Sequence, residues 1–325
     1  MKTKAIAALL GASLAWAAPQ VGAQGAAGFP NKPVRVVVGY TPGGSTDVMA
    51  RQVAQALSRL WGQNVFVENK PGAGGNVGAD MVAKSPADGY TLLMWHDGLA
   101  ANAGIYKKLP FDPVKDLTPV QTVARVSIVM GVGPAFPAQS VKAVIDLAKS
   151  KPGALTYASC GVGTPHHIAG EMFKSQAQVD IAHTSYKGCA PALNDVLGGH
   201  VPIFFQTLSN VIQQMKSGKV RVIAIADTAR LPDYPDLPTM AEAGLPGYSL
   251  SPWYGLFGPG GMPRDLLNKI SGDIARVVAT PELQASLKGI YFRPETTTPD
   301  EFARLVVADI ARLGKVVQAA GITPE

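Results

Sequence analysis

The sequence predicts an α/β protein of two domains, and three features of the chain support that prediction. Short apolar runs alternate with helical patterns along most of its length, which is typical of α/β layers with largely parallel sheets. A chain of 325 residues exceeds what one hydrophobic core usually supports. Two similar glycine-bearing turns, at 41–47 and 160–166, each lie between an expected strand and an expected helix.

The expected strands are short apolar runs bounded by turn residues. They are Val34–Val38, Val65–Val67, Leu92–Trp95, Ile128–Val132, Leu155–Ala158, Ile203–Phe205 and Val222–Ala226.

Helices are expected where apolar residues recur at helical spacing. One follows Asp47, and another follows Ser140 and ends at Pro152-Gly153. Three more near the C-terminus, at 263–278, 281–287 and 299–319, each begin at or near a proline, which suits a first helical turn.

No linker separates two sequential domains, so we expect the chain to cross between them more than once. The crossing points are expected near Thr122–Val129 and Gly247–Leu256. One domain would then comprise residues 30–125 and 251–325, and the other residues 126–250.

The N-terminus predicts export. Lys2 and Lys4 precede an almost uncharged apolar stretch, Ala5 to Ala18, and small residues follow at 21–23, so residues 1–23 match a secretory signal peptide. Its removal leaves 27 basic and 23 acidic residues, a net charge of +4. Because the basic residues are scattered along the chain, we expect no nucleic-acid surface. The mature protein is expected to be soluble, exported and monomeric.

The two turns combine glycine with residues that start helices. Ser45 or Thr46 is expected to cap the first helix, with Asp47 in its first turn. Thr164 fits an N-cap and Pro165 the first helical position of the second. Glycine lets a ligand approach the backbone, and free N–H groups at a helix start attract anions. Either turn alone could be an ordinary connection, but the pair predicts two half-sites that close on one small anion.

Cys160 and Cys189 are the two cysteines of the chain, and both flank glycine-containing turns. An even count in an exported protein favours a disulfide, which would fasten Lys187-Gly188-Cys189 to the second turn. A nucleophile built from Cys160 and His166 is the alternative. His166, His167 and Glu171 do not reach the three or four ligands that zinc normally needs, so no metal is expected.

Two enzyme hypotheses remain as rivals to a binding protein. An exported hydrolase would use Cys160 or Ser45 with a histidine, although the Gly-x-Ser-x-Gly motif is absent. A dinucleotide-dependent oxidoreductase would need glycines at the first, third and sixth positions of a turn, and Val77 breaks that pattern at 72–77. We therefore expect binding without a covalent step and without a cofactor.

Selectivity is expected from side chains at the ends of predicted strands, where α/β proteins commonly bind ligands. These are Trp95, His96 and Asp97, then Gln206, Thr207 and Ser209, and Trp253 with Tyr254 in the second crossing.

A series of motifs resembles the Bug (TctC-type) family, the substrate-binding proteins of tripartite tricarboxylate transporters. The resemblance covers essentially the whole mature chain, in order. The motifs are Pro42-Gly43-Gly44-Ser45-Thr46-Asp47, Val67-Glu68-Asn69-Lys70-Pro71-Gly72-Ala73-Gly74-Gly75, Asp88-Gly89-Tyr90-Thr91-Leu92-Leu93, Lys108-Leu109-Pro110-Phe111-Asp112-Pro113, Tyr186-Lys187-Gly188, Pro238-Thr239-Met240-Ala241-Glu242-Ala243-Gly244 and Trp253-Tyr254-Gly255-Leu256.

The resemblance implies a type II periplasmic-binding-protein fold, with two α/β domains joined by two crossing strands and closing on a carboxylate that is passed to a membrane permease. It also supports the Cys160–Cys189 bridge, since a subset of the family has cysteines there. The resulting candidate ligand-binding residues are Tyr40, Gly43, Ser45, Thr46, Asp47, Trp95, His96, Asp97, Gly161, Gly163, Thr164, His166, Tyr186, Gln206, Thr207, Ser209 and Trp253.

The chain departs from many relatives at Thr184-Ser185, at Trp95-His96-Asp97 and at Gln206, where an Asp is common. The loss of an acid and the gain of aromatic rings would suit a flat ligand body with carboxylate ends. An aromatic dicarboxylate such as terephthalate is one such ligand.

Overall fold

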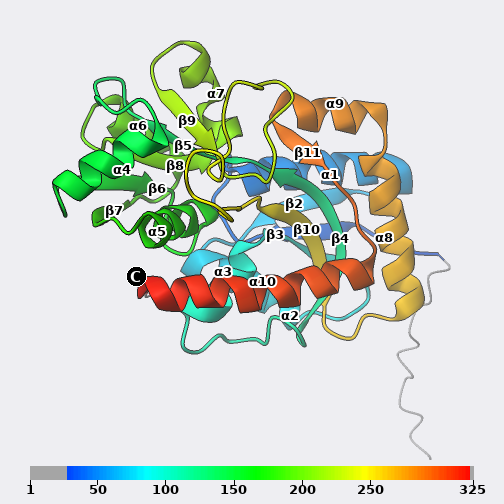
Figure 1. Ribbon diagram of the computed structural model, residues 1–325. Coiled ribbons are helices and arrows are strands. Elements are labelled where there is room, and N and C mark those ends of the chain that lie inside the picture. Colours follow the sequence, from blue (N-terminus) through cyan, green and yellow to red (C-terminus); the bar gives the residue numbers. More distant parts are fainter. Residues whose placement is uncertain (1–27, 323–325) are drawn as a thin grey trace, which may run out of the picture.

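Two β-sheets organise the chain in the computed structural model, which describes residues 28–322 (Figure 1). The expected signal peptide, residues 1–23, lies outside the described residues. The first sheet has the order β11-β4-β10-β3-β1-β2, and the second β7-β6-β8-β5-β9. The predicted α/β fold class is confirmed.

The strands and helices of the first sheet come from both ends of the chain. They are β1 (Val34–Val38), α1 (Ser45–Trp61), β2 (Val65–Asn69), the short 3-10 helix η1 (Ala73–Gly75), α2 (Asn76–Ala83), β3 (Thr91–His96), α3 (Gly98–Ile105), β4 (Leu117–Val126), β10 (Trp253–Pro259), α8 (Arg264–Val278), α9 (Pro281–Gly289), β11 (Phe292–Pro294) and α10 (Pro299–Ala320).

The second sheet is built from the middle of the chain. Its elements are β5 (Ile128–Val132), α4 (Val141–Ser150), β6 (Leu155–Ser159), α5 (Pro165–Ala177), β7 (Ile181–Ser185), α6 (Cys189–Leu197), β8 (Ile203–Thr207), α7 (Leu208–Lys216) and β9 (Arg221–Ile225).

Both sheets are mixed, so the expectation of largely parallel sheets is wrong. Parallel pairing is confined to β1 with β2 and β3, and to β6 with β7 and β8. The strand β10 returns from the second sheet and inserts between β3 and β4, antiparallel to both. In the same way, β5 lies antiparallel between β8 and β9. Strands that arrive from the other sheet need no crossover helix, and parallel order is lost where they enter.

The chain passes from the first sheet to the second at Ser127, between β4 and β5, and returns just before Trp253. The two passages are hydrogen-bonded to each other, since the Val126 N–H donates to the Pro252 carbonyl at 3.0 Å. A division into domains at 125/126 and 250/251 stays a prediction. One long helix, α10, runs past both sheets and ends beside α5 (Figure 1).

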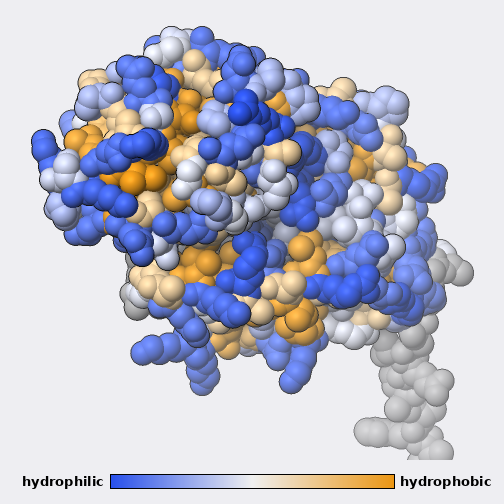
Figure 2. Space-filling view, viewed as in Figure 1, coloured by the Kyte–Doolittle hydropathy of each residue, from blue (hydrophilic) through white to orange (hydrophobic). Residues whose placement is uncertain are grey.

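On the face in Figure 2, hydrophobic residues lie in small groups among hydrophilic ones. Within residues 28–322, none of the helices combines the length and hydrophobicity needed to cross a bilayer.

Candidate functional site

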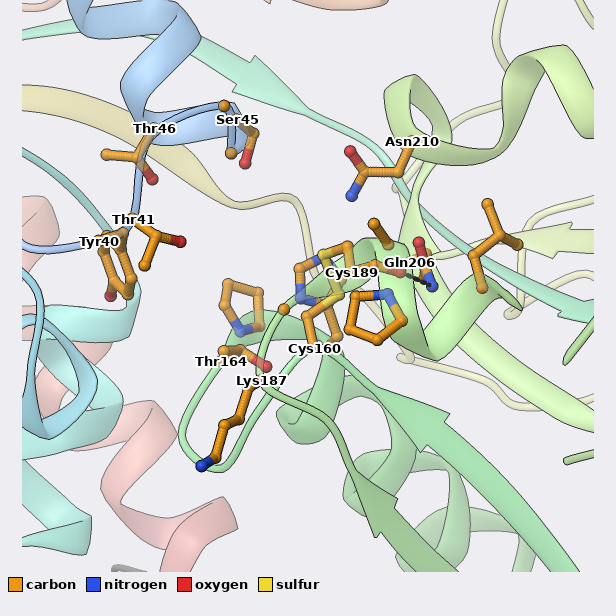
Figure 3. Close-up of a pocket in the computed structure, with 18 of the residues that line it drawn as sticks. Tyr40, Thr41, Ser45, Thr46, Cys160, Thr164, Lys187, Cys189, Gln206 and Asn210 are labelled. Atoms are coloured by element: carbon orange, nitrogen blue, oxygen red, sulfur yellow. Dashed lines mark hydrogen bonds between the residues drawn. A yellow bond between two sulfur atoms is a disulfide. The ribbon is translucent and has the colours of Figure 1, made fainter. Parts of the chain in front are cut away.

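A cavity of about 520 Å³ lies between the two sheets, and both glycine-bearing turns line it. From the first turn come residues 40–46, and from the second Cys160 and the start of α5 at Thr164–His166. The wall is completed by the segment 187–191, by polar residues of α6, β8 and α7, and by Tyr254 of β10. Figure 3 shows Ser45 and Thr46 on one side of the cavity, facing Asn210, Gln206 and the disulfide on the other.

The first turn is held by Asp47, whose side chain lies beneath it. The Gly43 N–H donates to Asp47 Oδ2 at 3.0 Å, and the same oxygen accepts from Arg51 Nε at 2.9 Å. Burial alone would raise the pKa of Asp47, but these hydrogen bonds outweigh it and lower the pKa below its usual range. Asp47 is therefore a buried, paired carboxylate that shapes the turn, and its side chain does not line the cavity.

The N-cap position of α1 is Gly44, which has no side chain to cap the helix, so the expectation that Ser45 or Thr46 caps it is wrong. The Ser45 hydroxyl instead lies 2.9 Å from the Tyr254 hydroxyl. An uncapped helix start leaves first-turn N–H groups without an intrahelical partner, and residues 44–46 line the cavity. The first turn therefore offers both hydroxyls and backbone donors to a ligand.

The second turn has the cap that the sequence predicts. The Thr164 side chain accepts from the His167 N–H, and Pro165 occupies the first helical turn. Thr164 Oγ1 also donates to the Gly161 carbonyl at 2.6 Å, which closes the turn.

The expected free donors at the turn glycines are already used within the protein. The Gly161 N–H donates to Ser159 Oγ at 3.2 Å, and the Gly163 N–H to His167 Nδ1 at 3.3 Å. Together with Gly43, these glycines shape the turns, whereas the backbone donors left for an anion lie in the first turns of the helices.

The cavity favours negative charge. Among the described residues that line it, none is Asp or Glu, and Lys187 is the one Lys or Arg. The N-terminal turns of α1, α5 and α6 face it from the two sheets, and the helix dipole makes each of these ends partly positive. Burial lowers the pKa of His166 to about 3, so this lining histidine is neutral at physiological pH.

Aromatic rings of the first sheet form one wall. Tyr40 stacks on His96 at 5.0 Å between ring centroids, and His96 lies 5.6 Å from Tyr254. The opposite wall carries carboxamides, from Gln206 of β8, Asn194 of α6, and Asn210 and Gln214 of α7. Gln206 Nε2 donates to the Cys189 carbonyl at 3.2 Å. Gln206 Oε1 and His166 Nδ1 are both buried and have no hydrogen-bond partner in the described structure. Such atoms are expected where a ligand or ordered water supplies the missing bond.

Cys160 and Cys189 form a disulfide, as predicted. Both sulfurs and a ring nitrogen of His166 come within 4.8 Å of one another. Because the sulfurs are bonded to each other, Cys160 is not the nucleophile of a hydrolase, and that alternative is wrong for this residue.

The comparisons with known proteins agree with this geometry. A family model described as the tripartite tricarboxylate transporter family receptor (TctC) matches residues 49–322. The chain belongs to this receptor family. Its members are periplasmic binding proteins rather than enzymes.

Relatives of this receptor resemble it along nearly the whole chain. BugT of Bordetella pertussis is 34% identical over 295 residues, which are 90% of each protein. A solved structure of Rpa4515 from R. palustris with adipate is 35% identical, with a TM-score of 0.85, covering 91% of this chain and 100% of that one. MatC from Rhodopseudomonas palustris with bound malate is 30% identical, with a TM-score of 0.80, covering 89% and 100%.

The structure of the receptor places about half of the predicted side chains at the cavity. The residues that line it are Tyr40, Gly43, Ser45, Thr46, His96, Thr164, His166 and Gln206, with both cysteines. The remaining candidates lie beside or behind it, namely Asp47, Trp95, Asp97, Gly161, Gly163, Tyr186, Thr207, Ser209 and Trp253.

Several of these remaining residues have side-chain hydrogen-bond partners within the protein. Trp95 Nε1 donates to the Tyr40 hydroxyl at 2.9 Å, and Trp253 Nε1 to Asp309 at 2.8 Å in the core. Tyr186 donates to Asp195, and Ser209 to Thr207. Asp97 is buried at the start of α3, where burial raises its pKa.

Sequence reasoning missed Asn194, Asn210 and Gln214, and it named Tyr254 beside Trp253 but kept only Trp253 among the ligand-binding candidates. A signal existed for both errors. Neighbouring residues of a strand face opposite sides, so Trp253 and Tyr254 cannot both reach the cavity. Asn210 and Gln214 are four apart and therefore share one face of α7.

Proposed function

We propose that this receptor binds a small organic dicarboxylate in the cavity and presents it to a membrane permease. The observation that carries the proposal is the cavity itself, where helix N-termini from the two sheets meet among lining residues that include no acidic side chain. One carboxylate would be held by the Ser45 and Thr46 side and by Thr164, through hydroxyls, first-turn N–H groups and water.

The ligand body would lie between the aromatic wall and the carboxamide wall. Adipate and malate, found with Rpa4515 and MatC, make aliphatic dicarboxylates the first candidates. Terephthalate is the aromatic candidate, because a flat ring would pack against Tyr40, His96 and Tyr254. Trp95 does not support this candidate, since it lies behind Tyr40.

The ligand binds a closed form of the receptor more tightly than an open form, and it therefore stabilises the closed form. Delivery would depend on the permease recognising that closed form. We propose that the exported, monomeric receptor offers this closed form to a permease of the tripartite type. The signal-peptide pattern of residues 1–23 and the family of the chain support this location and partner.

Calorimetric titration of the mature protein tests the proposal. Malate, adipate and terephthalate are titrated beside adipamide, which matches the length of adipate but carries no charge. We expect at least one dicarboxylate to bind with a stoichiometry of one, to be recovered chemically unchanged, and to bind at least tenfold more tightly than a neutral diamide of the same skeleton. Equal binding of diacid and diamide, or no binding by any member of a wider mono-, di- and tricarboxylate panel, would contradict it.

A further inference from the structure

We propose that the Cys160–Cys189 disulfide positions the second-sheet half of the ligand site, so that ligand affinity depends on the redox state of the bridge. The inference deepens the proposed function and rests on it. Both cysteines line the cavity, and the bridge joins two loops that each lead into a helix whose N-terminus faces it.

The bridge lies at the edge where two neighbouring strands end. β6 and β7 are parallel and paired up to Ser159 and Ser185, so their following loops leave the sheet side by side. Cys160 directly follows β6, and Cys189 is the first residue of α6. The bond brings their Cα atoms to 4.4 Å across 29 residues of sequence. It therefore ties the turn before α5 to the start of α6.

Little packs against the middle of the segment that the bridge holds. Lys187 is exposed, and a Cβ at Gly188 would meet no atom within 4 Å. Gly188 has a φ of +117°, a conformation that glycine adopts freely. A mobile loop here would spread the α6 N-terminus over many positions, and a ligand would then have to order it at a cost in affinity.

Two lining side chains depend on the position of Cys189. Its carbonyl accepts from Gln206 Nε2 at 3.2 Å, which fixes the orientation of the Gln206 amide. Its sulfur lies 4.0 Å from His166 Nε2, in the first turn of α5. Thiol sulfurs cannot stay at bonding distance, so opening the bridge removes the covalent link between the two loops and leaves both contacts without its support.

The chemistry requires a reductant, and the test supplies a dithiol. Dithiothreitol gives two electrons and two protons to the bridge. The S–S bond breaks, each cysteine becomes a thiol, and the reagent closes into its own cyclic disulfide. Removal of the reagent and mild oxidation reverse the reaction.

The first experiment compares ligand affinity in the two redox states. Malate and adipate are titrated into oxidised protein, reduced protein and the Cys160→Ser/Cys189→Ser double variant, at a temperature where circular dichroism shows all three folded. We expect reduction to weaken binding about tenfold, re-oxidation to restore it, and the variant to bind weakly whether or not dithiol is present. A merely structural bridge would lower the melting temperature and leave the affinity unchanged, and that result would overturn the inference.

The second experiment needs no ligand. Amide hydrogen exchange is measured for residues 193–197 of α6, whose amides are hydrogen-bonded within the helix, in oxidised and reduced protein, with α10 as the internal control. We expect reduction to speed exchange at 193–197 at least tenfold and to leave α10 unchanged. Equal protection of 193–197 in both states would overturn the inference. If no carboxylate bound even the oxidised protein, the proposed function would fail by itself, and this measurement would still decide whether the bridge positions the loop.

Discussion

At position 163, both the backbone and the neighbouring helix require glycine. Its φ is +76°, and a Cβ there would lie 2.9 Å from Ile105 Cδ1 and 3.0 Å from Asn102 Oδ1 of α3. The turn before α5 thus presses against a helix of the first sheet. A side chain at this position would push apart the two halves of the cavity.

Gly163→Ala should therefore weaken ligand binding as well as stability. Gly199→Ala is the matched control, since Gly199 has a φ of +77° and open space around it. We expect each variant to lose about 1 kcal/mol of unfolding free energy through backbone strain, measured by urea unfolding. Affinity for the best dicarboxylate should fall only in Gly163→Ala. Equal affinity in both variants would show that the contact with α3 does not shape the site.

The buried His166 makes a specific contribution to pH dependence. Its folded-state pKa is lowered to about 3 by burial, against about 6.5 in an unfolded chain. Protonation therefore favours the unfolded state, so the stabilising effect is complete above about pH 6.5 and declines as the pH falls toward 3.

We expect the wild type to lose about 2 kcal/mol more unfolding free energy than His166→Gln when the pH is lowered from 7 to 5. Urea unfolding of both proteins at each pH measures it, and the exposed His200→Gln serves as the control for a histidine outside the core. A difference that stayed constant with pH would mean that His166 is not held neutral in the folded state.

At the level of the elements, two of the helices whose N-termini face the cavity, α1 and α5, start differently. α5 has a threonine cap, whereas α1 begins at glycine and depends on Asp47 to hold the preceding turn. The capped start is rigid by local bonding. The uncapped start leaves more of its N–H groups for a ligand.

Thr164→Ala removes the cap of α5, and Thr298→Ala removes the equivalent cap of α10, far from the cavity. Each should cost about 1 kcal/mol of unfolding free energy. Dicarboxylate affinity should fall several-fold in Thr164→Ala alone, because its hydroxyl also closes the turn onto the Gly161 carbonyl. Calorimetric titration of the two variants side by side decides this, and a matching loss in Thr298→Ala would refute a local role.

At the level of the whole molecule, one hydrophobic cluster includes residues from elements of both sheets. Leu313 and Val317 of α10, with Ala101 and Ile105 of α3, belong to the same buried cluster as β5, β6 and α5 of the second sheet. The C-terminal helix therefore links the sheets by apolar packing, although most of its length lies with the first.

Leu313→Ala should destabilise the protein by about 2–5 kcal/mol, the usual cost of a cavity in a packed core. Val307→Ala, on the same helix with a half-exposed side chain, should change it by less than about 0.5 kcal/mol. Thermal and urea unfolding measure both. A small effect of Leu313→Ala would indicate that the end of α10 does not contribute to the buried cluster around β5, β6 and α5.

Much of the local structure was determined by the sequence alone. Thr164 and Pro165 identify the start of α5, Ser140 caps α4, and apolar spacing locates the long helices. These features depend on residues within a few positions of one another, where bonding rules act directly. The disulfide was also predictable, because only two cysteines are present in a chain that is predicted to be exported.

Only the tertiary structure decided which groups reach the ligand site. β4 and β10 were expected only as crossings between the domains, and their places in the first sheet were not predicted because their partners come from distant parts of the chain. The pairing of β10 turns Tyr254, and not Trp253, toward the cavity. The backbone of the turn glycines was expected to be open to a ligand, yet the N–H groups of Gly43, Gly161 and Gly163 each donate to a nearby side chain. Tertiary contacts decide which side of a strand faces a cleft and which acceptor binds a given N–H group. These contacts form only when the chain has folded and the two sheets have come together.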